Sequence, residues 1–163
     1  MYDIEASFDR QILAAKAQRP TVIFAEALDP RVLEAAFYLT RFCRPVFLAS
    51  EDQVMKAAGA LVAQGSVDRN RLDFALSESA FVDIREHPGL VEEFARECIG
   101  SGECCAGVSD LDGARAVVSE PGRFGIFAVH GGHADMVVGG AIHPAKDFFR
   151  PLIKVLANRP VIA

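Results

Sequence analysis

The sequence has no long hydrophobic run and no excess of positive charge. No stretch approaches the roughly 18 consecutive apolar residues that a membrane-spanning helix needs, so we expect no membrane partner. Lys and Arg number 17 against 22 Asp and Glu, which gives a net charge of −5. This balance argues against nucleic acid or an anionic membrane as the main partner, but it leaves room for a local cationic pocket. The acidic residues 1–10 lack the basic start of a signal peptide.

Several motifs with known chemistry are also missing. There is no Gly-x-Ser-x-Gly motif and no P-loop, and nothing pairs one cysteine with one histidine, so the catalytic residues stay unknown. The four cysteines show no disulfide-framework spacing, which predicts thiols in a reducing cytoplasm. His130, His133 and His143 suggest a zinc site, but Gly131-Gly132 disturbs the helical spacing that two ligands would need. We therefore predict no metal.

The length and the hydrophobic pattern describe one α/β domain that covers residues 1–163. A chain of 163 residues that is 51% hydrophobic and 24% charged suits a single packed core. Apolar runs alternate with amphipathic segments, which predicts a mainly parallel sheet with helices on both faces. The expected strands are 21–25, 46–49, 72–76 and 136–138, and a turn is expected at 120–122. The expected helices are 3–18, 30–42, 51–64, 90–98, 111–118, 124–129 and one from 145 that is kinked or restarts at Pro151.

The stretch 134–156 joins a short apolar strand, a glycine pair and an amphipathic helix. Ligands bind at the carboxyl ends of strands in open α/β sheets, and a helix start offers free N–H groups and the positive end of a dipole. Lys146 and Arg150 are four residues apart, so they share a helix face and lean toward the turn. The alternative is a tight structural turn beside two solvated cations. We predict an anion site formed by Gly139, Gly140, His143, Lys146 and Arg150.

Two acidic residues follow the first predicted strand. Glu26 lies at its carboxyl end, and Asp29 precedes Pro30 in the manner of a helix cap. Both are candidates for function because this end of the strand faces the ligand side of the sheet. For Asp29, a role as helix cap is the simpler interpretation.

Three stretches of the chain resemble the phosphate acetyl/butyryl transferase family. Residues 20–36 read P-T-V-I-F-A-E-A-L-D-P-R-V-L-E-A-A and are similar to the family's opening motif, an apolar strand, Pro-Glu-Gly, an acidic residue and Arg-Val-Leu-x-Ala-Ala. Residues 134–156 read A-D-M-V-V-G-G-A-I-H-P-A-K-D-F-F-R-P-L-I-K-V-L and resemble the family's A-D-G-x-V-S-G-A-x-H-[ST]-T-A-D-T-x-R-P-x-L-Q-I-I. Residues 110–129 are similar to the family's helix before that motif.

The resemblance implies a fold and a reaction. The fold is the three-layer α/β/α sandwich of the isocitrate-dehydrogenase-like group, and this chain matches the amino-terminal portion of the enzymes. The reaction converts acyl-CoA and phosphate to acyl phosphate and CoA, so coenzyme A is a substrate and no covalently bound cofactor is expected. Arg150 matches the family's substrate-binding arginine, whose planar fork suits phosphate. The acyl group is not specified by the resemblance.

The sequence departs from the family pattern in several places. Pro-Glu-Gly is Ala-Glu-Ala at 25–27, His-[Ser/Thr]-Thr-Ala is His-Pro-Ala-Lys at 143–146, and residues 97–107 hold no counterpart of a second family arginine. Family members are also about twice as long, and their remaining part carries a Ser-Arg pair and an Asp for the chemistry. Three interpretations stay open: a portion of an active transferase, a non-catalytic domain that binds CoA or acyl phosphate, and an interaction domain that forms a homo-oligomer such as a dimer.

Overall fold

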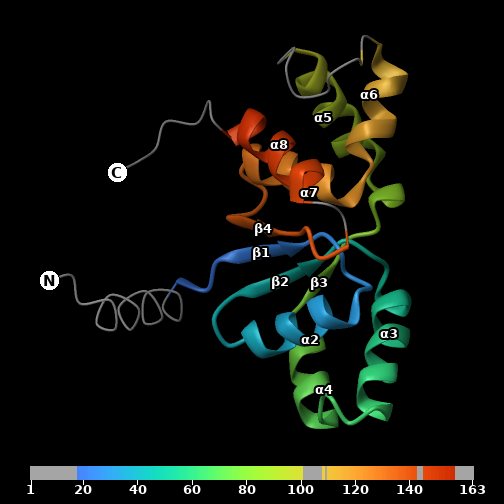
Figure 1. The fold of residues 1–163 in the computed structure, drawn as a ribbon, viewed down its shortest axis with the longest axis vertical. Coiled ribbons are helices and arrows are strands. Elements are labelled where there is room, and N and C mark those ends of the chain that lie inside the picture. Colours follow the sequence, from blue (N-terminus) through green and yellow to red (C-terminus); the bar gives the residue numbers. More distant parts are fainter. Residues whose placement is uncertain (1–17, 101–107, 109, 143–144, 157–163) are drawn as a thin grey trace, which may run out of the picture.

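A four-stranded parallel sheet forms the centre of the structure (Figure 1). The computed structural model describes residues 18–100, 108, 110–142 and 145–156. The strands are β1 (Thr21–Phe24), β2 (Arg44–Phe47), β3 (Ala80–Phe81) and β4 (Met136–Val138). Their order is β3-β2-β1-β4, and every neighbouring pair is parallel. The predicted α/β class with a mainly parallel sheet is confirmed.

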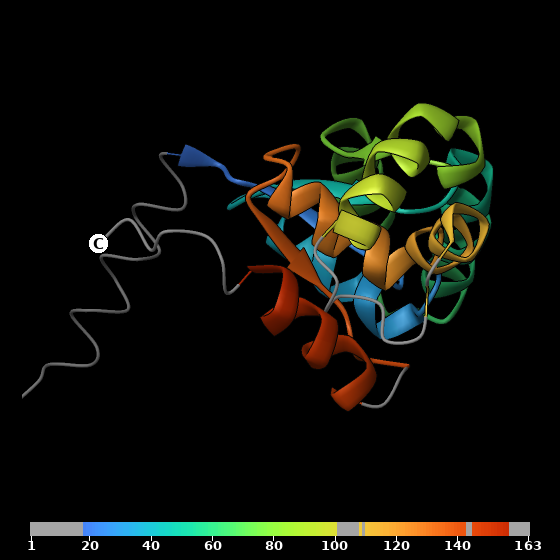
Figure 2. The same ribbon diagram turned by 90° about the horizontal axis from the view of Figure 1, so that it is seen from above.

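Helices cover both faces of this sheet, which gives the expected three layers (Figures 1 and 2). One face carries α2 (Pro30–Leu39), α3 (Glu51–Ala63) and α4 (Arg69–Ser77). The other carries α5 (Pro88–Gly100), α6 (Leu111–Val118), α7 (Pro121–His130) and α8 (Ala145–Leu156), and the short 3-10 helix η1 (Ile84–Glu86) precedes α5. Each face has its own hydrophobic core, because side chains alternate between the two faces of a strand: Phe24 joins the first core and Ile23 the second.

Local capping signals set several helix starts as predicted. The Asp29 carboxylate accepts a hydrogen bond from the backbone N–H of Arg31, and Pro30 occupies the first helical position of α2. Ser50 forms a capping box with Gln53 at the start of α3. Asp110 accepts from the N–H of Gly113 and begins α6. These bonds satisfy N–H groups that the first helical turn cannot pair internally.

Two expected elements are wrong. Residues 72–76 form part of α4 rather than a strand, because Asp68 caps a helix there and its inward face repeats at Leu72 and Ala75. The third strand is Ala80–Phe81 instead. The expected turn at 120–122 is the beginning of α7, with Pro121 in its first turn, where the missing proline N–H costs nothing. The second strand begins two residues earlier than expected, and α8 runs through Pro151 as one helix.

Some expectations concern residues outside the described ranges, including all but the last residue of the helix expected at 3–18. Of the two cysteines in the described ranges, Cys43 is free and buried, as predicted, whereas Cys98 is disulfide-bonded, which differs from the predicted thiol. Among the helices in the described ranges, none is both long enough and apolar enough to cross a membrane.

Close packing of α7 on the sheet brings the start of this helix to the ends of the strands. Gly125 is buried in α7, and a Cβ atom built there would lie 2.7 Å from Cγ2 of Val137 and 3.2 Å from Cγ2 of Ile23. Only glycine allows the helix to approach β1 and β4 this closely. Pro121 and its neighbours therefore stand next to the residues that follow β1.

Candidate functional site

A cavity of about 580 Å³ lies where β1 and β2 end. The chain leaves β1 for β2 on one side, while β4 lies on the other side of β1, so the strand order reverses at β1. Open α/β sheets place their ligands at such a reversal. The lining residues are Ala25, Glu26, Ala27, Leu28, Asp29, Leu48, Glu120, Pro121, Gly122, Arg123, Ile126, Ile142 and Phe148. This cavity is our candidate site.

The carboxylate of Glu26 holds the loop that follows β4. Glu26 is a buried charged residue directly after the end of β1. One of its oxygens accepts a hydrogen bond from the N–H of Ala141 at 2.5 Å, and the other accepts from the N–H of Ile142 at 3.0 Å. A carboxylate that accepts two backbone N–H groups is well satisfied even when little water reaches it. Glu26 therefore links two loops that flank the cavity.

Asp29 and Arg31 add a second link to the same loop. The Arg31 guanidinium donates to both carboxylate oxygens of Asp29, at 3.0 and 2.8 Å, and also to the carbonyl of Ala141 at 2.9 Å. The side-chain hydrogen bond from Arg31 is the main reason why the pKa of Asp29 falls from 3.8 to about 2. Asp29 is thus the helix cap that the sequence suggested, and it also orients the arginine that reaches the loop.

The local structure explains why glycine occupies both positions 139 and 140. A Cβ atom built on Gly139 would lie 2.4 Å from Cε2 of Phe148, so the ring of this α8 residue packs directly on the backbone. Gly140 has a φ of +90°, a conformation that other residues rarely adopt. The structural-turn alternative accounts for both glycines, and a role for them in binding an anion stays a prediction.

The predicted cations are only partly within the described structure. Arg150 is exposed on α8 and forms no ion pair or hydrogen bond with another described residue, and it is not among the described residues that line the cavity. Lys146 belongs to the same helix, but its side chain is outside the described part, as is the whole of His143. The structure thus brings Gly139, Gly140 and α8 together, and it leaves the contribution of the two other side chains open.

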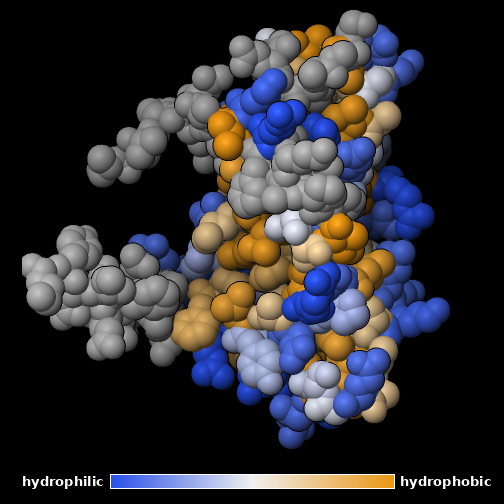
Figure 3. Space-filling view, viewed as in Figure 1, coloured by the Kyte–Doolittle hydropathy of each residue, from blue (hydrophilic) through white to orange (hydrophobic). Residues whose placement is uncertain are grey.

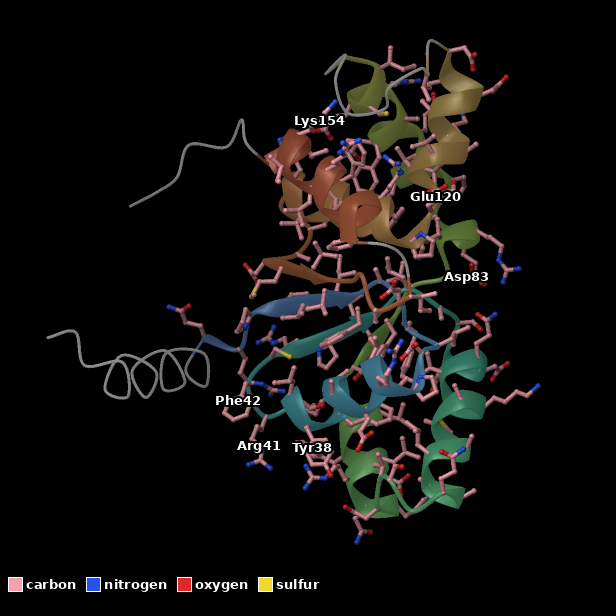
Figure 4. The ribbon with its side chains drawn as sticks, in the orientation of Figure 1. Tyr38, Arg41, Phe42, Asp83, Glu120 and Lys154 are labelled. Atoms are coloured by element: carbon pink, nitrogen blue, oxygen red, sulfur yellow. The ribbon has the colours of Figure 1, made fainter. Side chains whose placement is uncertain are left out.

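The first turn of α7 forms a wall of the cavity that the sequence analysis missed. Glu120 precedes the helix, and its carboxylate accepts a hydrogen bond from Nε of Arg123 at 3.1 Å. Figure 4 shows Glu120 and Asp83 on the side of the molecule where the strands end, whereas Lys154 lies higher up on α8. The Glu-Pro pair was a usable signal, because an acidic residue before proline is also typical of a helix start.

The two described histidines of the suggested zinc site face carboxylates instead. Nδ1 of His130 pairs with Glu97, and Nε2 of His133 lies 4.0 Å from a carboxylate oxygen of Glu93. Both contacts join α7, or the residues just after it, to α5. Within the described ranges there is no group of three His, Cys, Asp or Glu residues that could hold a metal ion.

Comparison with known proteins agrees with this architecture. Phosphate acetyltransferase of Acetivibrio thermocellus is 25% identical over 160 residues, which cover 94% of this chain and 42% of the relative. The Bacillus subtilis phosphate acetyltransferase is 24% identical over 140 residues, covering 85% of this chain and 39% of the relative. A crystal structure of a phosphotransacetylase from Streptococcus pyogenes matches with a TM-score of 0.66 at 22% identity, over 94% of this chain and 43% of that one.

These observations define an α/β/α domain that has a cavity at its strand ends and whose fold is similar to that of phosphotransacetylases. The model of the family described as "Phosphate acetyl/butaryl transferase" matches residues 7–163, and the chain belongs to this family. It spans about 42% of the length of the Acetivibrio relative. The resemblance noted in the sequence is therefore confirmed.

Proposed function

We propose that this chain is a phosphate acyltransferase-like domain that binds acyl-CoA and phosphate and serves their conversion to acyl phosphate and CoA. The observation that carries the proposal is the family match over residues 7–163, combined with a cavity at the strand reversal. Acyl-CoA and phosphate are accordingly the proposed partners, and no bound cofactor is proposed. The proposed location is the cytoplasm.

The chemistry sets the requirements for the site. A phosphate oxygen forms a bond to the acyl carbonyl carbon, a tetrahedral oxyanion develops, and the bond to the CoA sulfur breaks as the thiolate leaves. Such a site needs cations for phosphate and hydrogen-bond donors for the oxyanion. We assign phosphate binding to the exposed Arg150 together with Gly139, Gly140, His143 and Lys146, the set that the sequence motif predicts.

Two observations support a second candidate, a domain that binds CoA or acyl phosphate without turnover. The chain matches only 42% of the length of the Acetivibrio enzyme, so most of that enzyme's length has no counterpart in the matched part. In addition, the N–H groups of Ala141 and Ile142 already donate to Glu26 and are not available to an oxyanion. We also propose a homo-oligomer, such as a dimer, which sedimentation can test.

The test is a CoA-release assay on the purified chain with acetyl-CoA and phosphate, beside a CoA titration. Arg150→Ala should weaken CoA or phosphate binding by ~1.5–3 kcal/mol, because a charge-assisted contact is lost. Arg44→Ala is the matched control: Arg44 is also exposed, but it lies at the amino end of β2, whereas the cavity lies at the carboxyl ends of the strands.

The outcomes separate the two candidates. Turnover that disappears only in Arg150→Ala supports an acyltransferase. Binding that depends on Arg150 without any turnover supports the non-catalytic domain. Equal CoA and phosphate affinities in the wild type and Arg150→Ala would remove the proposed anion site.

A further inference from the structure

The lining of the cavity is mainly apolar. Its described walls come from the β1–α2 loop, the end of β2, α7, Ile142 after β4 and Phe148 on α8. The apolar lining residues are Ala25, Ala27, Leu28, Leu48, Pro121, Ile126, Ile142 and Phe148. Two of them, Leu28 and Ile142, are large hydrophobic residues that remain substantially exposed. Figure 3 shows apolar residues in orange across the middle of the molecule, at the height of the sheet.

The charged lining residues already have partners within the protein. Glu26 accepts from two backbone N–H groups, and Asp29 is held by the fork of Arg31. Glu120 and Arg123 pair with each other. Among the described residues, the lining therefore holds three carboxylates and one arginine, and that arginine is paired with Glu120. A phosphate group placed here would face net negative charge, whereas a neutral apolar group would meet a compatible surface.

From this contrast we infer that the cavity binds the neutral acyl-thioester end of the substrate, while the phosphate groups stay outside it, toward Arg150. The inference rests on the proposed function for the identity of the thioester. The volume of about 580 Å³ lies within the usual range of small-molecule pockets, so the cavity has room for acyl groups longer than acetyl. Burial of each further methylene should then tighten binding about fourfold until the cavity is filled.

The probes are neutral thioesters without any phosphate: S-acetyl-, S-butanoyl- and S-hexanoyl-N-acetylcysteamine. Calorimetry on the unmodified chain should show affinity that rises with acyl length. The affinity should be the same at about 0.05 M and about 0.5 M salt, because no net charge is involved. It should also be unchanged in Arg150→Ala, which separates the apolar cavity from the proposed phosphate site.

Substitutions at two exposed isoleucines locate the binding. Ile142 lines the cavity and is 60% exposed, whereas Ile153 on α8 is 62% exposed and does not line it. Ile142→Ser should weaken hexanoyl thioester binding at least fivefold, and Ile153→Ser should leave it unchanged. Because the sequence contains no Trp, Leu28→Trp and Ile153→Trp each introduce a single fluorescent reporter. Only the Leu28→Trp emission should change saturably with thioester.

Each outcome bears on the inference. Absence of thioester binding in a folded chain that still binds CoA through Arg150 overturns the cavity assignment and leaves the proposed function standing. Thioester binding as expected, with no affinity for CoA, supports the apolar cavity and overturns the proposed function. Displacement of the thioester by inorganic phosphate, read from the Leu28→Trp reporter, would show that the cavity is an anion site and overturn the inference.

Discussion

The carboxylate of Glu26 accepts a hydrogen bond from the backbone N–H of Ile142 at 3.0 Å, across 116 positions of the sequence. Together with the bond from Ala141, this contact joins the end of β1 to the loop after β4. Arg31 reinforces the link from the other side through the carbonyl of Ala141. The shape of the cavity mouth thus depends on a few polar bonds between its two flanking loops.

Replacing Glu26 by glutamine should destabilise the fold. The amide has only one oxygen, so one of the two N–H groups would lose its acceptor, and the remaining bond would no longer be charge-assisted. We expect the free energy of unfolding to fall by ~1–3 kcal/mol in urea denaturation. Glu86→Gln removes the same charge at an exposed position and should change stability little. Equal stabilities of Glu26→Gln and the wild type would show that the link is dispensable.

Gly139→Ala should also destabilise the protein, because the new Cβ would collide with the ring of Phe148. Moving a buried ring in a packed site costs ~1–3 kcal/mol. Gly140→Ala tests a different cause, since its φ of +90° is strained for alanine although the nearest atom lies 4.0 Å away. In contrast, Gly59→Ala in α3 meets nothing within 4 Å and should stabilise the helix by ~0.5–1 kcal/mol. Thermal unfolding of the three variants is the measurement, and a stable Gly139→Ala would refute the close contact.

The stability of the chain should depend on pH through Asp29. Its pKa is about 2 in the folded protein and 3.8 without its partners, so the ionised form favours folding. This contribution is complete above the unfolded pKa and declines as the pH falls from about 4 toward 2. Asp29→Asn should therefore reduce stability at pH 6 more than at pH 3, as measured by urea unfolding at both values.

Asp83 provides an internal comparison for this effect. It pairs with Arg85 through the same three-residue arrangement, and its pKa is likewise lowered to about 2, mainly by the side-chain hydrogen bond from Arg85. Asp83→Asn should show the same pH-dependent loss, but it should leave thioester and CoA binding unchanged because Asp83 does not line the cavity. A loss of stability that is identical at pH 6 and pH 3 in both variants would contradict the assigned pKa shifts.

The sequence by itself determined the elements whose signals lie within a few residues. The composition of residues 21–24, which are β-branched or aromatic, was sufficient to predict a strand, and the Asp29-Pro30 cap was predictable because its contacts join near neighbours. The family motifs were readable for the same reason, since they are contiguous stretches. The α/β class followed from the alternation of these elements.

Tertiary structure decided the rest, because the deciding contacts join distant residues. Three such contacts depend on how the layers pack: the pairing of β4 with β1, the hydrogen bond from Ile142 to Glu26, and the contact of Gly139 with Phe148. The strand expected at 72–76 was wrong because a short apolar run fits both the period of a strand and the period of a helix. The Asp68 cap and the burial of one helix face show that this run is helical. The first turn of α7 lines the cavity because Gly125 allows this helix to pack closely on the sheet. No local pattern encodes this approach, since it requires the side chains of Ile23 and Val137 to lie against the same glycine.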